Sequence, residues 1–287
     1  MNLTRKEFLS FCLSFAALGV PALTSAAQSP PLPKSINRKK EVQIEWLGHG
    51  SFKFISRDGK VILLDPWISS NPKIPGKYRS FTGFEKVDLI LFTHGHVDHF
   101  MLPDVKQLIK KYSPDIIAPW ELQFFIKSEI PTAKCMTFQL ANQGGTYDYH
   151  GVKISMVNAN HSSGAQLTAF TGTNRFMGQA VGYIMEFENG YKVYHSGDTG
   201  LMSDMKLVIG DYYKPDLAIL PIGNTFTMGP REAAYACTMI QPSIVIPGHY
   251  GTFPVLEQTP KSFISNLDEL YPASECLPLE PGENTFV

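Results

Sequence analysis

Residues 91–100, LFTHGHVDHF, place three histidines and an aspartate within six positions, directly after an apolar run. In an extended chain, residues two apart point to the same side, so His94 and His96 can reach one ion. Asp98 and His99 follow after a tight turn and can reach a second ion close to the first. Neutral imidazoles and a carboxylate suit zinc, manganese or iron and not calcium. The stretch therefore predicts a site for divalent transition metals.

Three further residues are expected to complete this site. His161 follows the apolar strand predicted at 152–157 and lies in a polar loop, so we expect it to be the third ligand of the first ion. Asp198, in YHSGDTG, follows a hairpin strand, where a carboxylate can bridge two cations. His249, in IVIPGHYG, lies just past a buried strand and would complete the ligands of the second ion.

Two parts of the chain resemble each other in the elements that must position these residues. Residues 52–66 and 183–198 are each two alternating apolar runs joined by Asp-Gly or Asn-Gly, a strong hairpin signal. Two later pairs of segments also match, 87–96 with 215–224 and 113–119 with 241–247. The offset between matched residues is 128 or 131 positions, which indicates an internal duplication. The alternative is two generic α/β units that share only propensity.

Each half is then expected to run hairpin, buried strand, helix, strand. The predicted helices cover 103–111, with Val105, Leu108 and Ile109 facing inward, and 230–239, which opens with a proline in its first turn. With or without a duplication, the pattern predicts two sheets with helices outside them.

Composition limits the classes of protein that fit. The chain has 287 residues, 44% of them apolar, and a formal net charge of −1, so it can form one large domain, or two small ones, with a substantial core. Its only basic cluster is Arg38-Lys39-Lys40, so we expect no nucleic-acid partner. Apart from Cys12, the cysteines are odd in number and widely spaced, so at most one disulfide can form.

The N-terminal residues have the pattern of a signal peptide. Arg5 and Lys6 precede an apolar stretch at 8–23, and small residues follow it up to Ala27. Export by the general or the twin-arginine route is open, because Lys6 stands where the second arginine of the latter motif is expected. An uncleaved anchor is the alternative, but Pro21 breaks the short apolar run. We expect a signal peptide at 1–27, a linker at 28–40, the domain that carries the metal site at 41–287, and a periplasmic or extracellular location.

The order of the motifs, HxHxDH, a lone His, Gly-Asp and a lone His, resembles the metallo-β-lactamase superfamily over residues 41–257. WLGHGSF, LLDPW, YHSGDTGL, LPIGNTFTMGP and PGHYGTFP are similar to its metal-dependent hydrolase branch related to ascorbate-6-phosphate lactonase. The resemblance implies an α/β fold, a four-layer αββα sandwich of two mixed sheets with a metal pair at one edge. It also implies that His94, His96 and His161 hold one ion, that Asp98, His99 and His249 hold the other, and that Asp198 lies between them.

Four other residues are candidates for supporting the ligands or contacting the substrate. His49 and His195 lie near ligand-bearing loops, where a purely structural hydrogen bond is the alternative role. Asp65 ends a predicted strand, and the resemblance favours a role in orienting a ligand histidine. Asn224 lies in the loop that matches 93–96 and is expected at the mouth of the site.

These residues predict a hydrolase that uses two divalent metal ions, zinc first and Mn²⁺ or Fe²⁺ as alternatives. A water shared by two cations loses its proton near neutral pH, and the resulting hydroxide can attack an ester or lactone of a small molecule. We expect Asp98 and Asp198 to be catalytic. Phe170, Arg175 and Phe176, in the loop from 162 to 177, favour an anionic substrate with an apolar part.

Other functions remain open. A phosphodiesterase of the phospholipase D type, acting on a lipid, would use the same motifs. A diiron redox protein usually has an acidic residue where Gly95 stands. A non-catalytic metal-binding module is less consistent with two acidic members in the ligand set. We expect no stable membrane insertion after signal cleavage, and the sequence does not fix the oligomeric state.

Overall fold

The computed structural model describes residues 41–166 and 174–287. The predicted signal peptide, 1–27, the linker, 28–40, and Phe170 lie outside the described residues. Among the helices that the structure does describe, none is both long and apolar enough to span a bilayer.

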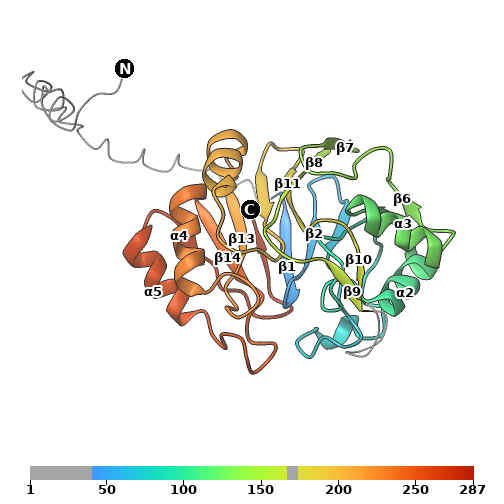
Figure 1. Ribbon diagram of the computed structural model, residues 1–287, viewed down its shortest axis with the longest axis horizontal. Coiled ribbons are helices and arrows are strands. Elements are labelled where there is room, and N and C mark those ends of the chain that lie inside the picture. Colours follow the sequence, from blue (N-terminus) through green and yellow to red (C-terminus); the bar gives the residue numbers. More distant parts are fainter. Residues whose placement is uncertain (1–40, 167–173) are drawn as a thin grey trace, which may run out of the picture. The chain divides into compact units, whose positions relative to one another are not determined.

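Two seven-stranded mixed sheets form the centre of the fold (Figure 1). The first contains, in spatial order, β16 (Asn284–Phe286), β1 (Gln43–Gly48), β2 (Ser51–Ile55), β3 (Val61–Leu64), β4 (Leu89–Leu91), β5 (Asp115–Ile117) and β6 (Lys134–Cys135). The second contains β15 (Glu275–Cys276), β14 (Ile244–Gly248), β13 (Leu217–Pro221), β12 (Lys192–His195), β11 (Val181–Glu186), β8 (Val152–Asn158) and β7 (Thr146–Tyr149). A separate ribbon pairs β9 (Gly164–Gln166) with β10 (Asn174–Phe176).

The two sheets share one topology, as the predicted duplication requires. In the first sheet β2 and β3 form an antiparallel hairpin, and β4, β5 and β6 then add in parallel. In the second, β11 and β12 form the hairpin, and β13, β14 and β15 add in parallel. The antiparallel partners β1 and β8 are also equivalent. One position differs in chain order: the C-terminal β16 takes the edge beside β1 that β7 takes beside β8.

Helices cover the outer faces, which gives the predicted αββα layers (Figure 1). The helical segments are η1 (Gly76–Tyr78), α2 (Leu102–Tyr112), α3 (Trp120–Glu129), η2 (Met205–Tyr213), α4 (Pro230–Ile240) and α5 (Lys261–Leu270). Helices α2 and α4 confirm the two predicted helices to within one residue at each end. The predicted inward face of α2 is also confirmed, because Val105, Leu108 and Ile109 are buried.

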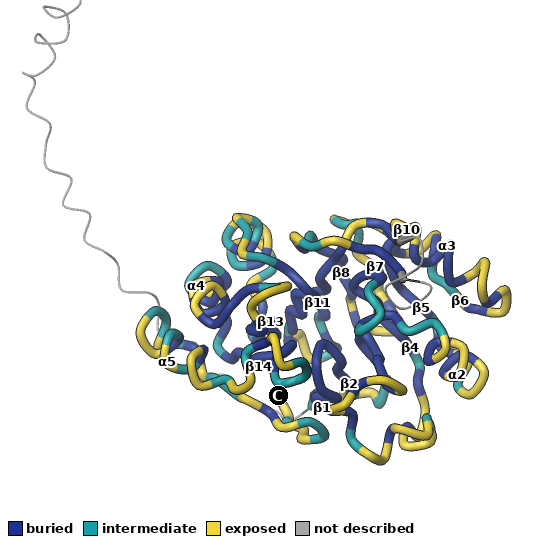
Figure 2. The backbone as a smooth tube through the Cα atoms, turned by 60° about the horizontal axis from the view of Figure 1, so that its bottom comes forward, coloured by how far each residue is buried: buried dark blue, intermediate teal, exposed yellow. Residues whose placement is uncertain are grey.

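Apolar side chains fill the space between the layers, and the central strands are buried while most exposed residues lie on edge strands, helices and loops (Figure 2). One core cluster joins both sheets and includes Phe52 of β2 and Tyr183 of β11. A second joins the first sheet to its helices and includes Ile90 and Phe125. Each large apolar side chain buried in this way contributes about 1.5–3 kcal/mol. The packing fixes the strands, and the segments just beyond their ends therefore have defined positions.

Candidate metal centre

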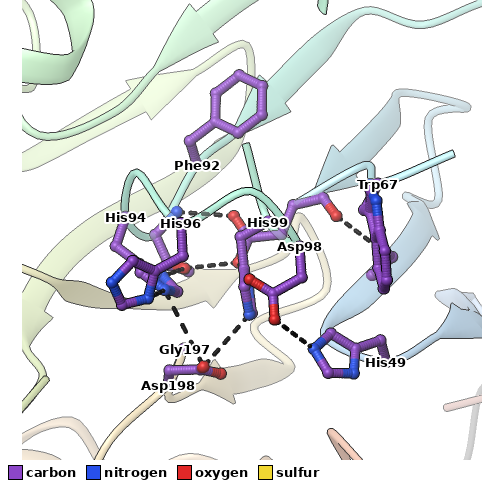
Figure 3. Close-up of polar contacts among 12 residues, drawn as sticks. His49, Trp67, Phe92, His94, His96, Asp98, His99, Gly197 and Asp198 are labelled. Carbon is purple, nitrogen blue, oxygen red and sulfur yellow. Dashed lines mark hydrogen bonds and ion pairs between the residues drawn. The ribbon is translucent and has the colours of Figure 1, made fainter. Parts of the chain in front are cut away.

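The seven predicted metal ligands all lie in segments that follow strands. His94, His96, Asp98 and His99 come after β4, His161 after β8, Asp198 after β12, and His249 after β14. The parallel strands β12, β13 and β14 end at one edge of the second sheet, and β3 and β4 do so in the first. The structure brings all seven side chains together there, and Figure 3 shows five of them in close-up.

Three histidines form the first donor group. His94 Nε2 lies 3.0 Å from His96 Nδ1, and His161 Nε2 lies 3.2 Å from the same nitrogen. His94 is buried, whereas His96 and His161 are partly exposed. Three imidazole nitrogens this close together can hold one zinc-type ion and leave a coordination position open toward solvent.

His49, Asp98, His99 and His249 lie close enough together to hold one ion, and the last three form the predicted second donor group, which is more deeply buried than the first. His99 Nε2 and His249 Nε2 lie 3.3 and 3.0 Å from Asp198 Oδ2, yet neither nitrogen has a hydrogen-bond partner. Buried polar atoms are normally satisfied. Two unsatisfied nitrogens beside a carboxylate oxygen fit a divalent cation, so the residues present are suited to the predicted metal.

Asp198 contacts both donor groups. Its Oδ2 lies 4.0 Å from His94 Nε2 and 3.7 Å from His161 Nε2, in addition to its contacts with the second group. Only 5% of its side-chain surface is exposed. The geometry therefore allows one carboxylate to reach two ions, while its role as a bridge stays a prediction.

Asp65 orients one histidine of each group. It is fully buried, and its Oδ2 lies 2.8 Å from His99 Nδ1 and accepts a 2.5 Å hydrogen bond from Thr93 Oγ1. Because that hydroxyl donates its only proton to Asp65, it accepts one from His94 Nδ1, 2.9 Å away. In the neutral state, which metal binding requires, both histidines then present an unprotonated Nε2 to the site. Sequence reasoning missed Thr93, and its position just before HxH was the available signal.

His49 supports the second group. Its Nε2 lies 3.1 Å from Asp98 Oδ2 and its Nδ1 lies 3.0 Å from Thr252 Oγ1. Its ring centroid lies 3.8 Å from that of His249. Burial and His249 lower the pKa of His49 to about 4, so the ring is neutral at pH 7. It therefore acts as a hydrogen-bonding support for Asp98 (Figure 3).

His195 and Asn224 lie in different surroundings. His195 is buried, and its Nδ1 accepts a 3.0 Å hydrogen bond from the backbone N–H of Gly197, which holds the turn that carries Asp198. Burial and His99 lower the pKa of His195 to about 3, consistent with an acceptor. Asn224 is exposed in a tight turn after β13, where its N–H donates to Met228 O. The structure thus favours support over substrate contact for His195 and leaves Asn224 accessible.

The pKa shifts of His94, in the first group, and His99, in the second, have opposite directions. Burial, followed by the charge of His99, holds the pKa of His94 well below its ordinary value. Burial also lowers the pKa of His99, but the carboxylates of Asp198 and Asp65 outweigh it and raise that pKa well above its ordinary value. Conversely, burial raises the pKa of Asp198, and His249 and His99 reverse the effect and hold it well below its usual range. Without metal, His99 is therefore the protonated histidine of the centre.

The backbone around the metal centre is adapted to the close packing of its side chains. A Cβ on Gly50 would lie 2.5 Å from His99 Cε1, so only glycine allows the ring its place. His49, Asp65 and His249 all adopt left-handed backbone conformations, with φ of 57°, 45° and 56°. Such conformations are costly for non-glycine residues and cluster at functional sites.

Solved structures define the class of fold. Igni18, a metallo hydrolase from Ignicoccus hospitalis, aligns with a TM-score of 0.72 and 29% identity, over 86% of this chain and 98% of that one. The metallo-β-lactamase fold protein YhfI from Bacillus subtilis aligns with a TM-score of 0.61 over 85% and 98% of the two chains, and at 12% identity it shows the fold alone. The chain has the metallo-β-lactamase fold, as predicted.

Sequence relatives then give the family. Residues 43–249 match the beta-lactamase superfamily domain. A UPF0173 metal-dependent hydrolase of Roseiflexus sp. is 38% identical over 248 residues, which is 85% of this chain and 97% of that protein. A UPF0173 metal-dependent hydrolase from Methanosphaera stadtmanae is 40% identical over 244 residues, which is 85% of this chain and 98% of that protein. The chain belongs to the UPF0173 metal-dependent hydrolases, which confirms the predicted branch and enzyme class.

Proposed function

We propose that the protein hydrolyses an ester, lactone or similar bond of a small molecule, using two divalent ions, with zinc as the best match to the donors. The observation that carries this proposal is the position of Asp198 Oδ2, which lies within 4.0 Å of nitrogens from both donor groups. When bound, such ions activate water and stabilise developing negative charge. Imidazole-rich donor sets favour zinc over magnesium or calcium.

Asp98 is the carboxylate best placed to act on the attacking water. Its side chain is 23% exposed, against 5% for Asp198 and none for Asp65. Burial raises the pKa of Asp98, but the hydrogen bond with His49 and the charge of His99 outweigh it and hold that pKa far below the usual range. Asp98 therefore stays ionised and accepts a hydrogen bond from the nucleophile without supplying a proton.

The substrate approaches over the first donor group. A pocket of about 380 Å³ begins at His96 and His161 and continues past Ser162 and Phe176. In the second group, His99 and His249 are buried, and none of its members is among the described residues that line this pocket. The reacting bond can thus reach the centre from the solvent side of His96.

A substrate screen with matched variants tests the proposal. The full chain is depleted of metal, reloaded with zinc, manganese or iron, and assayed against esters, lactones, thioesters and phosphodiesters. Asp98→Ala should abolish turnover of any substrate found, whereas Asp211→Asn, which changes an exposed acid on η2, should leave it unchanged. Wild-type turnover in Asp98→Ala, or cleavage of phosphodiesters alone, would contradict the proposal.

We also propose that the protein is exported, on the basis of the pattern in residues 1–27. Expression of the full chain in a bacterial host, followed by N-terminal sequencing of the secreted or periplasmic fraction, tests this. The expected mature protein begins near Gln28. Recovery of only the full-length chain in the membrane fraction would instead support an uncleaved anchor.

A further inference from the structure

A groove leads away from the metal centre. The pocket that begins at His96 and His161 shares Phe176 and Gln179 with a second pocket of about 490 Å³. Met156 and Val181 are among the apolar lining residues of this second pocket. A substrate whose reacting bond lies at His96 can therefore extend its remote part past Phe176 into the second pocket, here called the distal pocket.

Uncharged polar side chains and one acid line the distal pocket. The uncharged ones are Asn142, Gln143 and Gln179, and Glu121 is the acid. No Lys or Arg occurs among its described lining residues. The lining thus offers amide donors and acceptors together with a negative charge, which favours hydroxyl or cationic groups and disfavours anions.

Glu121 is exposed, and its carboxylate lies against the backbone of Gly178. A Cβ on Gly178 would lie 2.5 Å from Glu121 Oε2, and Gly178 has a φ of 87° that favours glycine. Because Gly178 lines the pocket next to the metal centre, Glu121 stands where the two pockets meet. Within residues 41–166 and 174–287, no Lys or Arg nitrogen forms an ion pair with it.

Arg175, which the sequence suggested as an anion-binding residue, is directed elsewhere. Its guanidinium carbon lies 5.3 Å from the ring centroid of Phe125, and it is not among the described lining residues of either pocket. Phe176, by contrast, lines both pockets and is 65% exposed. The ring of Phe176 and the carboxylate of Glu121 line the same pocket, and together they favour binding of a cation such as an ammonium group.

We infer that the distal pocket binds the remote part of the substrate and selects a cationic or hydroxyl-bearing group over an anionic one, with Glu121 as the residue that determines this specificity. The inference rests on the proposed function, since the groove is assigned to the substrate of the metal centre. It names a substrate class and narrows the small molecules to be tested.

A charge series of esters tests the inference. The probes are 4-nitrophenyl hexanoates that end in a trimethylammonium, a hydroxyl or a sulfonate group, assayed with the zinc-loaded full chain. At a separation of several ångströms in a largely aqueous groove, one charge changes kcat/KM by about three- to tenfold. Because the cation gains that factor and the anion loses it, we expect the trimethylammonium ester to exceed the sulfonate by about ten- to hundredfold. Glu121→Gln should bring the ratio close to one, and Glu121→Lys should invert it.

Glu129→Gln is the matched control, because Glu129 is exposed at the other end of the same helix. It should keep the wild-type ratio, and thermal melting should show that all variants are folded. An unchanged ratio in both Glu121 variants would overturn the inference.

Equilibrium dialysis with the corresponding uncleavable 4-nitrophenyl ethers separates this inference from the proposed function. If the esters are not cleaved but the ethers bind with the same charge order, the proposed function fails and the distal pocket stands. If the esters are cleaved without charge order, the inference fails alone. Failure of all three ethers to bind also contradicts the inference.

Discussion

The two halves of the molecule have the same strand order but contribute differently to the centre. Asp198 follows β12, and Asp65 follows the equivalent strand β3. Asp198 Oδ2 faces four imidazole nitrogens, whereas Asp65 is fully buried and holds His99 and Thr93. The segments after equivalent strands thus provide a candidate metal ligand in one half and the support for ligands in the other.

A second pair of equivalent segments shows the same division. His49 lies in the turn between β1 and β2, and His161 lies in the matching connection between β8 and β11. His161 belongs to a donor group, while His49 hydrogen bonds to Asp98. A duplicated fold therefore places polar residues after the same strands twice, and the contacts of each side chain distinguish candidate ligands from supporting residues.

Replacing the two aspartates should give the largest contrast. Asp198→Ala removes the oxygen shared by both donor groups, so we expect a loss of kcat/KM well beyond the ~10–100-fold range of a supporting residue. Metal content by mass spectrometry should fall below two ions per chain. Full metal content with wild-type turnover would show that Asp198 does not belong to the centre.

Asp65→Asn should have a smaller effect that identifies a supporting role. The amide can still accept from Thr93 N–H, but it removes the charge that orients His99, so metal affinity should fall by about 10–100-fold. Competition with a chelator measures this change. A loss as complete as that of Asp198→Ala would make the two carboxylates equivalent and remove the contrast.

Replacing His161 and His49 in turn sharpens the comparison between the two halves of the molecule. His161→Gln should abolish one metal site, whereas His49→Gln should retain two ions and lower kcat by about tenfold through misplacement of Asp98. Metal content and single-substrate kinetics separate the two outcomes. Loss of an ion from His49→Gln would place His49 among the ligands.

Metal affinity should depend on pH through the second donor group. In the metal-free protein the pKa of His99 is raised, so His99 must release a proton before its Nε2 can bind an ion. Affinity should therefore rise with pH, by about tenfold per pH unit, until the pH passes that pKa. Calorimetry of zinc binding in buffers of different ionisation enthalpy should detect about one proton released per chain. Affinity that falls as pH rises would contradict the assignment of the proton.

Local patterns made much of the fold and centre predictable. The Asp58-Gly59 and Asn189-Gly190 turns mark the two hairpins, and the structure has both. The HxHxDH stretch carries four candidate ligands within a few residues, so its clustering follows from chain geometry alone. These features depend on short-range spacing, which the sequence states directly.

Long-range contacts were not predictable in the same way. Strand β16 pairs with β1 from the far end of the chain, and three residues are too short a pattern to predict a strand. Thr252 contacts His49 over more than two hundred positions, and the carboxylate of Glu121 lies against Gly178 from a different segment of the chain. Such residues have ordinary surface types, and only the packed fold reveals their neighbours.

Anomalous diffraction from crystals of the zinc-loaded protein tests the central claim most directly. We expect two peaks, one about 2.0–2.2 Å from the ligand nitrogens of His94, His96 and His161 and the other at similar distances from Asp98, His99 and His249. Asp198 should contact both. Zinc bound elsewhere, or donor side chains turned away from every peak, would contradict the account.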